Sequence, residues 1–362
     1  MLSVGIIGLP NVGKSTLFNA LTAGKAEVSN YPFTTINPNL GVVAVPDPRL
    51  DALEQALAPE KKTPCCISFT DIAGLVKGAS QGEGLGNQFL GEIRGVDALA
   101  HVVRLFSDPN VSHVFADVDP VRDVEVVDTE LMLADLEIVS RIVERRDKEW
   151  RTHPQQHAAE QRRLVGYRGA LERGAPLRTL ELDPLERAEL KAIGLLTGKP
   201  LLVVANIAEE TPSSSEARAM AELGQRVVGA ETIAIAAKLE WELMQLDPVE
   251  RRELMGELGM AEAGLDRLVR ASFHLLGLIS FYTIAKNKLQ AWEIPRGTLA
   301  PAAAGKVHTE MEKGFIRAQV APAAELLARG SWHEVQKVGA VHTVGRSYEV
   351  QDGDVVEFLF SA

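Results

Sequence analysis

Residues 3–22 read SVGIIGLPNVGKSTLFNALT, and this stretch decides the fold of the first part of the chain. The apolar run at 3–9 predicts a buried strand, and a helix is expected from Lys14 to Leu21. Between them, GLPNVGKS (8–15) matches the phosphate-binding pattern G-x-x-x-x-G-K-[ST] in the strand–turn–helix context that the motif requires. The stretch therefore predicts a P-loop fold that binds a nucleoside triphosphate.

The residue types of this loop fit phosphate chemistry. Gly8 and Gly13 let the backbone curl so that successive N–H groups face phosphate oxygens, and the helix N-terminus adds partial positive charge. Lys14 supplies a point charge to the β- and γ-phosphates, and Ser15 offers its hydroxyl to Mg²⁺. The expected nucleotide contacts of the loop come from Asn11, Val12, Gly13, Lys14, Ser15 and Thr16.

Two later stretches predict the rest of the phosphate and metal site. NYPFTTINPN (30–39) is a polar loop in which Thr34 and Thr35 are candidate Mg²⁺ ligands, and Thr35 is the preferred one. DIAG (71–74) follows an apolar strand, so Asp71 is expected to reach Mg²⁺ through water and the Gly74 N–H to meet the γ-phosphate.

Strands and helices alternate through most of the chain. Further apolar runs at 40–45, 65–72, 98–106, 200–206 and 231–237 predict strands of a mostly parallel sheet with helices on both faces. The expected nucleotide-binding domain comprises residues 1–127 and 196–277. The fold class is therefore α/β.

Residues 128–195 interrupt this alternation with two long amphipathic stretches, which predict an inserted helical hairpin. Residues 141–173 hold nine Lys/Arg and five Asp/Glu, a local charge of +4 in a chain of net charge −11. Either this is a solvated helical face, or it is a docking surface for RNA phosphates.

The sequence pattern of residues 278–362 is typical of a small sheet crossed by a helix. A strand–turn–strand is expected around Lys286–Lys288, a helix over 302–315, a strand over 316–321 and a second hairpin that turns at Asp352-Gly353. This segment forms the third expected domain.

Composition limits the classes of protein that remain. The two cysteines, Cys65 and Cys66, are adjacent in an expected strand, which argues against a disulfide or a cysteine-based metal site and suits a reducing cytoplasm. The N-terminus lacks a signal-peptide pattern, and the apolar stretch at 273–285 is too short to span a membrane. A cytoplasmic protein without a membrane partner is expected.

The motifs at 8–22, 30–39 and 71–90 resemble those of the YchF (Obg-like) ATPases, a subfamily of translation-factor-related GTPases. The resemblance continues into 291–320 and DGDVVEFLF (352–360), which look like that family's C-terminal TGS domain. It implies an Obg-type nucleotide domain, an inserted helical hairpin and a β-grasp-like TGS domain. It also implies a preference for ATP and association with the ribosome through rRNA and ribosomal proteins, and we expect a monomer.

Residues 199–210, KPLLVVANIAEE, bear on the choice of base. GTP-binding switch proteins end this strand with Asn-Lys-x-Asp, and the Asp accepts two donors of guanine. Here Asn206 is followed by Ile207 in place of Lys and by Glu209 in place of Asp. The longer Glu209 overshoots the guanine edge, and Ile207 offers an apolar face that suits adenine. Loss of the carboxylate that accepts both guanine donors costs enough binding free energy to invert the preference between guanine and adenine. ATP is therefore predicted, with Ala237 of the stretch 234–240 as a further base contact.

Several alternatives stay open at this point. One alternative is that Glu209 is merely a solvated residue at the start of a helix. Another is that the protein is a GTPase of the wider Obg group, which would have the same architecture. A metabolic kinase is disfavoured because the DIAG switch is superfluous there, and a binding scaffold that does not hydrolyse nucleotide is a further possibility. Asn11 leaves open whether a monovalent cation such as K⁺ assists.

The residue that activates water is not obvious from the motifs. Ras-like GTPases orient water with a Gln directly after the switch glycine, but Leu75 occupies that position here. His113, in the loop after the strand at 98–106, is the candidate that replaces it, because an imidazole can orient water and titrates near neutral pH. A surface or packing His is the plain alternative. His101, inside the strand, is expected to be structural.

Overall fold

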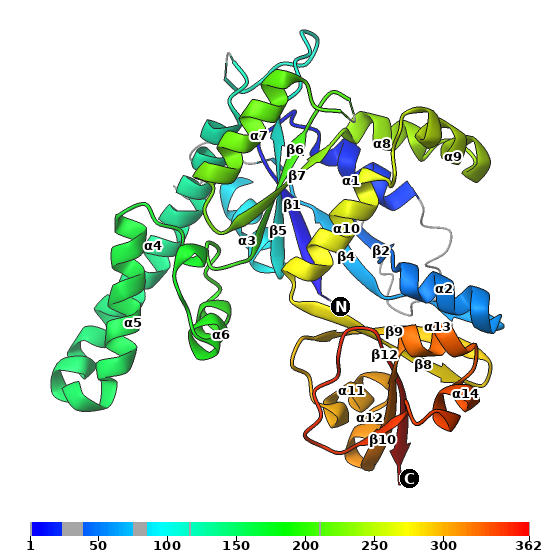
Figure 1. The fold of residues 1–362 in the computed structure, drawn as a ribbon. Coiled ribbons are helices and arrows are strands. Elements are labelled where there is room, and N and C mark those ends of the chain that lie inside the picture. The colour runs from blue at the N-terminus through cyan, green and yellow to red at the C-terminus, as the bar shows by residue number, and fades with distance from the viewer. Residues whose placement is uncertain (1, 24–38, 75–84, 116, 210, 362) are drawn as a thin grey trace. The chain divides into compact units, whose positions relative to one another are not determined.

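The computed structural model describes residues 2–23, 39–74, 85–115, 117–209 and 211–361 (Figure 1). They group into two units. One comprises Leu2–Gly41 with Ser68–Leu268, and the other comprises Val42–Ile67 with Val269–Ala362.

The first unit is built on a six-stranded sheet. Its strand order is β2 (Leu40–Ala44), β4 (Cys66–Asp71), β1 (Ser3–Ile7), β5 (Ala98–Arg104), β6 (Leu201–Asn206) and β7 (Ala230–Ile235). The pairings of β4 with β1, β1 with β5, β5 with β6 and β6 with β7 are all parallel. Every residue of β5 and β6 is buried, as expected for central strands of a sheet that is covered on both faces. The predicted α/β fold class is confirmed.

The helices of this unit follow the strands. They are α1 (Lys14–Ala23), α3 (Leu85–Arg94), α7 (Ser214–Arg226), α8 (Ala237–Leu243) and α9 (Pro248–Glu257), and α10 (Gly264–Leu275) continues into the other unit. Helix α1 begins at Lys14, within the last two residues of the phosphate-loop motif, and it buries residues at helical spacing. Because parallel strands end at one edge of the sheet, the loops that follow β1, β4, β5 and β6 meet at that edge.

The charged insertion is a pair of packed helices, α4 (Pro120–Thr152) and α5 (Pro154–Glu172), which run side by side (Figure 1). Val143 and Trp150 of α4 share a buried cluster with Leu164 and Tyr167 of α5. His153 separates the two helices, and the proline that follows it favours a break there. A 3₁₀ turn (Leu177–Thr179) and α6 (Pro184–Ile193) complete the insertion. The predicted hairpin is present, and its first helix begins eight residues before position 128.

The second unit contains another six-stranded sheet. Its order is β11 (His342–Val344), β10 (Phe315–Pro322), β12 (Asp354–Phe360), β8 (Leu278–Ala285), β9 (Lys288–Pro295) and β3 (Lys61–Thr63). Lys286 and Asn287 have positive φ angles of 50° and 60°, which fits the two-residue turn predicted between β8 and β9. Its helices are α2 (Pro48–Leu57), α11 (Ala300–Val307), α12 (Thr309–Lys313), α13 (Ala323–Arg329) and α14 (Trp332–Lys337).

Three local expectations for this unit were wrong or incomplete. The hairpin predicted at Asp352-Gly353 is absent, because β12 pairs with β10 and β8 and residues 345–353 directly before it form no named strand. The helix expected over 302–315 is broken at His308, whose extended backbone separates α11 from α12. Strand β3 was not anticipated, and it pairs in parallel with β9. The three domain boundaries and the TGS assignment remain predictions.

Across the part of the chain that is described, helices long enough to cross a bilayer are too polar to do so. Cys65 and Cys66 are both buried, and neither is in a disulfide.

Candidate nucleotide-binding site

Glycine is required at two positions of the loop between β1 and α1, because of the backbone conformation there and because neighbouring atoms lie too close for a side chain. Gly8 has a φ angle of +145°, and a Cβ there would lie 2.4 Å from the carbonyl oxygen of Val102 in β5. Gly13 has a φ angle of +100°, and a Cβ there would lie 2.2 Å from Nδ2 of Asn206 at the end of β6. Such φ angles favour glycine, and no side chain fits at these separations. The motif glycines therefore let the loop lie against two neighbouring strands.

Lys14 is folded back onto its own loop. Its ammonium is largely buried, and Nζ donates to the carbonyl oxygen of Leu9 at 2.8 Å. Burial lowers the pKa of Lys14 to about 8, although the nearby Asp71 partly opposes this shift. A Cβ at Gly74 would lie 3.0 Å from Lys14 Nζ, so the switch glycine is beside this ammonium.

Ser15 and Asp71, two of the predicted metal residues, are in contact. Ser15 Oγ donates to Asp71 Oδ2 at 2.9 Å across the carboxyl ends of β1 and β4. A hydroxyl and a carboxylate are hard oxygen ligands, and Mg²⁺ typically takes one or two protein oxygens together with phosphates and water. The residues present therefore fit Mg²⁺. The third predicted ligand, Thr35, lies outside the described residues.

Asn206 connects the phosphate loop to the predicted base-binding segment. Its Nδ2 donates to the carbonyl oxygen of Val12 at 2.9 Å, and its Oδ1 accepts from the backbone N–H of Ala237 at 3.1 Å. Asn206 is 5% exposed, so both halves of a buried amide are satisfied. Three predicted site residues from distant parts of the sequence are thus brought together by one side chain.

The segment after Asn206 departs in part from the sequence expectation. Ile207 is only 3% exposed, and its N–H donates to the carbonyl oxygen of Ile235 at 3.0 Å. Its apolar face is therefore buried in this structure and presents little surface to a base. Glu209 is exposed.

Sequence reasoning missed Glu216, which accepts hydrogen bonds from this segment and from the start of α7. Its Oε1 accepts from the N–H of Ala208 at 3.0 Å, while its Oε2 accepts from the N–H of Ser213 at 2.8 Å. Burial raises the pKa of Glu216, but the hydrogen bonds from the Ser213 hydroxyl and from these two backbone N–H groups outweigh burial and keep the pKa below its ordinary value. The pattern Ser213-x-x-Glu216 is a capping box at the start of α7, and it could have been recognised in the sequence.

Arg104, at the end of β5, was also missed, and it shapes the loop that carries His113. Its guanidinium donates to the carbonyl oxygens of Phe106, Asp108 and Val111 at 3.0, 3.0 and 2.9 Å. Arg104 is 2% exposed, and its Cζ lies 4.4 Å from the centre of the Phe106 ring. A charged residue inside an apolar strand was the available signal, because buried charges need partners.

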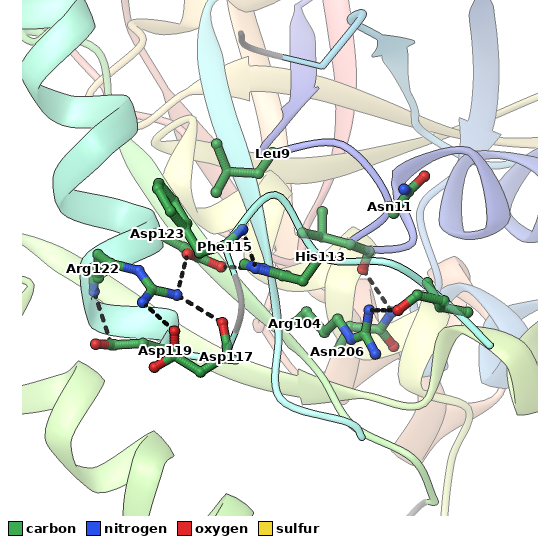
Figure 2. Close-up of polar contacts among 12 residues, drawn as sticks. Leu9, Asn11, Arg104, His113, Phe115, Asp117, Asp119, Arg122, Asp123 and Asn206 are labelled. Atoms are coloured by element: carbon green, nitrogen blue, oxygen red, sulfur yellow. Dashed lines mark hydrogen bonds and ion pairs between the residues drawn. The ribbon is translucent and has the colours of Figure 1, made fainter. Parts of the chain in front are cut away.

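The same loop contacts the phosphate loop (Figure 2). Asn11 has a left-handed φ angle of 63°, and its Nδ2 donates to the carbonyl oxygen of Ser112 at 3.2 Å and to Ser112 Oγ at 3.3 Å. Since asparagine tolerates this backbone region better than most residues, position 11 suits both the turn and the contact.

His113 is buried against the first turn of α4 (Figure 2). Its Nε2 lies 2.9 Å from Oδ2 of Asp123, and its Nδ1 accepts from the N–H of Phe115 at 3.2 Å. The side chains of His113 and Asp123 are 5% and 1% exposed. Both ring nitrogens are therefore engaged within the protein. His101 is fully buried in β5, where burial lowers its pKa to about 3, which agrees with a structural role.

The structure thus assembles most of the predicted residues at one edge of the sheet. Val12 is buried, Thr16 lies in the first turn of α1, and Ala237 begins α8. Leu75 lies outside the described residues. Within the described residues, His, Cys, Asp and Glu side chains form no group of three that could hold a metal by themselves.

Comparisons with known proteins show which family the chain belongs to. A family model described as 50S ribosome-binding GTPase matches residues 3–140, and the C-terminal model of YchF-type GTPases, described as a protein of unknown function, matches residues 278–361. A protein of Bacillus subtilis named Ribosome-binding ATPase YchF is 45% identical to this chain, with 99% of each chain covered. The chain belongs to the YchF family.

Other YchF proteins extend this likeness. The protein of the same name from Escherichia coli O157:H7 is 44% identical over 99% of this chain and 98% of its own length. The solved structure of the Schizosaccharomyces pombe YchF GTPase is 32% identical and superimposes with a TM-score of 0.89, covering 99% of this chain and 97% of that one. The resemblance inferred from the motifs is therefore confirmed over the whole length.

The lowered pKa of Lys14 predicts how nucleotide affinity depends on pH. Bound phosphates favour the protonated ammonium and raise its pKa, so affinity is full below the free-state pKa of about 8 and falls as the pH rises above it. Uptake of one proton on binding corresponds to at most about tenfold in dissociation constant per pH unit. Calorimetric titration with a non-hydrolysable triphosphate analogue and Mg²⁺, from about pH 7.5 to pH 9.5, measures this slope. Lys14→Arg, which stays protonated, should lose it, and a flat profile for the unaltered chain would contradict the assignment.

Proposed function

We propose that this chain is a ribosome-associated P-loop ATPase that binds and hydrolyses ATP with Mg²⁺ in preference to GTP. In this proposal it acts in the cytoplasm as a monomer, and the nucleotide switches its state in translation or in a stress response. The observation that carries the choice of ATP is the segment Asn206-Ile207-Ala208-Glu209, which lacks the Lys and Asp of the guanine pattern while the phosphate loop is intact.

The phosphate loop supplies binding and charge stabilisation. Lys14 exchanges the carbonyl oxygen of Leu9 for β- and γ-phosphate oxygens, and the ammonium then faces the charge that develops on the γ-phosphate. Ser15 and Thr35 would hold Mg²⁺, with Asp71 reaching it through water, and the bound ion would neutralise phosphate charge. The Gly74 N–H, beside Lys14, donates to the γ-phosphate. Assays in K⁺ and in Na⁺ test whether a monovalent cation acts at Asn11.

Water activation is assigned to His113. Leu75, which follows the switch glycine, can neither donate nor accept a hydrogen bond. The loop of His113 contacts the phosphate loop through Ser112 and Asn11, so this histidine is close in the chain to the site of attack. Its ring must exchange one of its two internal hydrogen bonds for the water.

Ribosome association is supported by the names of the bacterial relatives and by the hairpin. Many hairpin arginines are in ion pairs: Arg141 with Glu137, Arg146 with Glu149, Arg151 with Asp147, and Arg163 with Glu189. Arg145 and Arg162 are exposed and have no ion-pair partner among the described residues. These two are the arginines best placed to contact RNA phosphates.

A GTPase with the same architecture is the second candidate. It is favoured by the description of the matched nucleotide-domain model as a GTPase, and the fission-yeast relative is likewise named a GTPase.

The first prediction concerns the base. The unaltered chain should bind an ATP analogue at least about tenfold more tightly than the matching GTP analogue, which corresponds to about 1.4 kcal/mol. Ile207→Lys with Glu209→Asp restores the guanine pattern and should lower this ratio about tenfold, whereas Glu209→Gln, which only removes charge, should leave it unchanged. Calorimetric dissociation constants decide the matter. Tighter binding of GTP by the unaltered chain would favour the second candidate.

The second prediction concerns the hairpin. Replacing Arg145 and Arg162 by Gln should weaken co-sedimentation with ribosomes and reduce the slope of log affinity against log salt by roughly one to two, because two phosphate contacts are lost. Replacing the paired Arg146 and Arg163 is the matched control, and it should have the smaller effect. ATP binding should not change in either variant. An association that does not depend on salt would indicate protein contacts instead.

The third prediction concerns His113. His113→Ala should lower single-turnover ATP hydrolysis by roughly 10- to 100-fold, the range for one water-orienting or acid–base group, while ATP affinity stays within about twofold. His342→Ala, at an exposed position of the other unit, serves as the control. Asp123 is buried and loses its partner in this variant, so thermal melting of His113→Ala checks that the fold is retained. Undiminished hydrolysis would remove His113 from the site.

A further inference from the structure

The contacts of His113 determine which of its ring nitrogens carries the proton. A neutral imidazole has one N–H donor and one acceptor nitrogen. The backbone N–H of Phe115 points at Nδ1 from 3.2 Å, so Nδ1 must be the acceptor. The proton is therefore on Nε2, where it donates to Oδ2 of Asp123 at 2.9 Å.

Asp123 is itself held tightly in the first turn of α4. Its side chain is 1% exposed, and its second oxygen, Oδ1, lies 3.6 Å from Nη2 of Arg122 and has no hydrogen bond within the described residues. The helix begins with Asp119, whose side chain accepts from the N–H of Arg122. A carboxylate fixed in this way has little freedom to follow a moving ring.

Arg122 fixes the remainder of the loop to the same turn. Its Nη1 donates to Oδ1 of Asp117 at 2.8 Å, and its Cζ lies 4.4 Å from the centre of the Phe115 ring. Figure 2 shows these contacts around His113. The imidazole is thus oriented by α4 rather than by the phosphate loop.

We propose that Asp123 is the positioning residue for His113: it holds the ring in the Nε2–H tautomer and leaves Nδ1 as the nitrogen that takes the attacking water. This proposal rests on the assignment of water activation to His113. The two hydrogen bonds of the ring differ in kind. The bond to Phe115 is longer and comes from a residue two positions away in the same loop, whereas the bond to Asp123 is shorter, buried and charge-assisted.

A water molecule therefore replaces the Phe115 N–H at Nδ1, and Asp123 stays in place. The water oxygen then bonds to the γ-phosphorus, and the bond from that phosphorus to the β–γ bridging oxygen breaks with its electron pair going to ADP. The water proton passes to Nδ1 and then to the released phosphate. Asp123 stabilises the imidazolium formed in between, as a buried carboxylate does for histidine in other hydrolases.

The first test measures the tautomer directly. Ring ¹⁵N chemical shifts of His113 in the full chain, with and without a non-hydrolysable ATP analogue, should report the Nε2–H tautomer near neutral pH. An Nδ1–H tautomer in both states would overturn the proposal. This measurement uses the unaltered chain, so it stands even where a variant fails to fold.

The second test compares single-turnover ATP hydrolysis in Asp123→Asn, His113→Ala and the double variant. Asp123→Asn keeps the shape but removes the charge, and it should slow hydrolysis roughly tenfold while ATP affinity stays within about twofold. The double variant should be no slower than His113→Ala, because residues that act as a unit are not additive. Glu125→Gln, which removes the charge of an exposed carboxylate two positions further along α4, should hydrolyse ATP at the rate of the unaltered chain.

The outcomes separate the two levels of the proposal. Undiminished hydrolysis in His113→Ala removes His113 from the reaction, and the role of Asp123 falls with it. Slow hydrolysis in His113→Ala together with a rate within twofold of normal, or faster, in Asp123→Asn overturns the positioning role alone. A double variant that is another tenfold slower than His113→Ala also overturns it, because Asp123 would then act independently of the ring.

Discussion

The site depends on the close approach of the phosphate loop to the end of β6. Gly13 leaves room for the Asn206 amide, and that amide joins the Val12 carbonyl oxygen to the Ala237 N–H. A side chain at position 13 would displace Asn206 and leave buried polar groups unpaired, at about 1–3 kcal/mol each. The phosphate-loop motif and the predicted base-binding segment are therefore joined by the two hydrogen bonds of one buried side chain.

The loop after β5 is joined to the same unit from the other side. The N–H groups of Leu105 and Phe106 both donate to the carbonyl oxygen of Asn206, at 2.9 and 3.3 Å. Arg104 then turns the loop back with three hydrogen bonds to backbone carbonyl oxygens, which brings Ser112 to Asn11. A buried guanidinium with several partners gives a well-defined conformation to a segment that has no regular secondary structure. The position of His113 thus follows from contacts made by its neighbours.

How much of this could be predicted from the sequence depends on how local each constraint is. The phosphate loop with its flanking strand and helix follows from a local motif and was predicted, whereas the hydrogen bond between Ser15 and Asp71, both predicted to serve Mg²⁺, was found only in the structure. The pairing of β3 with β9 joins residues more than 220 positions apart, and no local pattern marks it. The turn at Asp352-Gly353 has typical hairpin residues, but β12 finds its partners in β10 and β8, so tertiary pairing overrode turn propensity. The burial of Ile207 and the orientation of His113 depend on packing. They could not be predicted because the type of a residue does not show which way its side chain points.

Helix α4 runs from the predicted nucleotide site into the charged helical hairpin. It is a single helix of 33 residues, about 50 Å long, with Asp123 in its first turn and Arg145 much further along. A physical link between distant sites needs an element with two arrangements that both sites bias. The first turn of α4 contacts the His113 ring, its middle packs against α5, and no proline interrupts it after Pro120. Helix α4 is therefore the element that connects the hairpin to the partner of His113 in the fold, and the orientation of the ring depends on a carboxylate of this same helix.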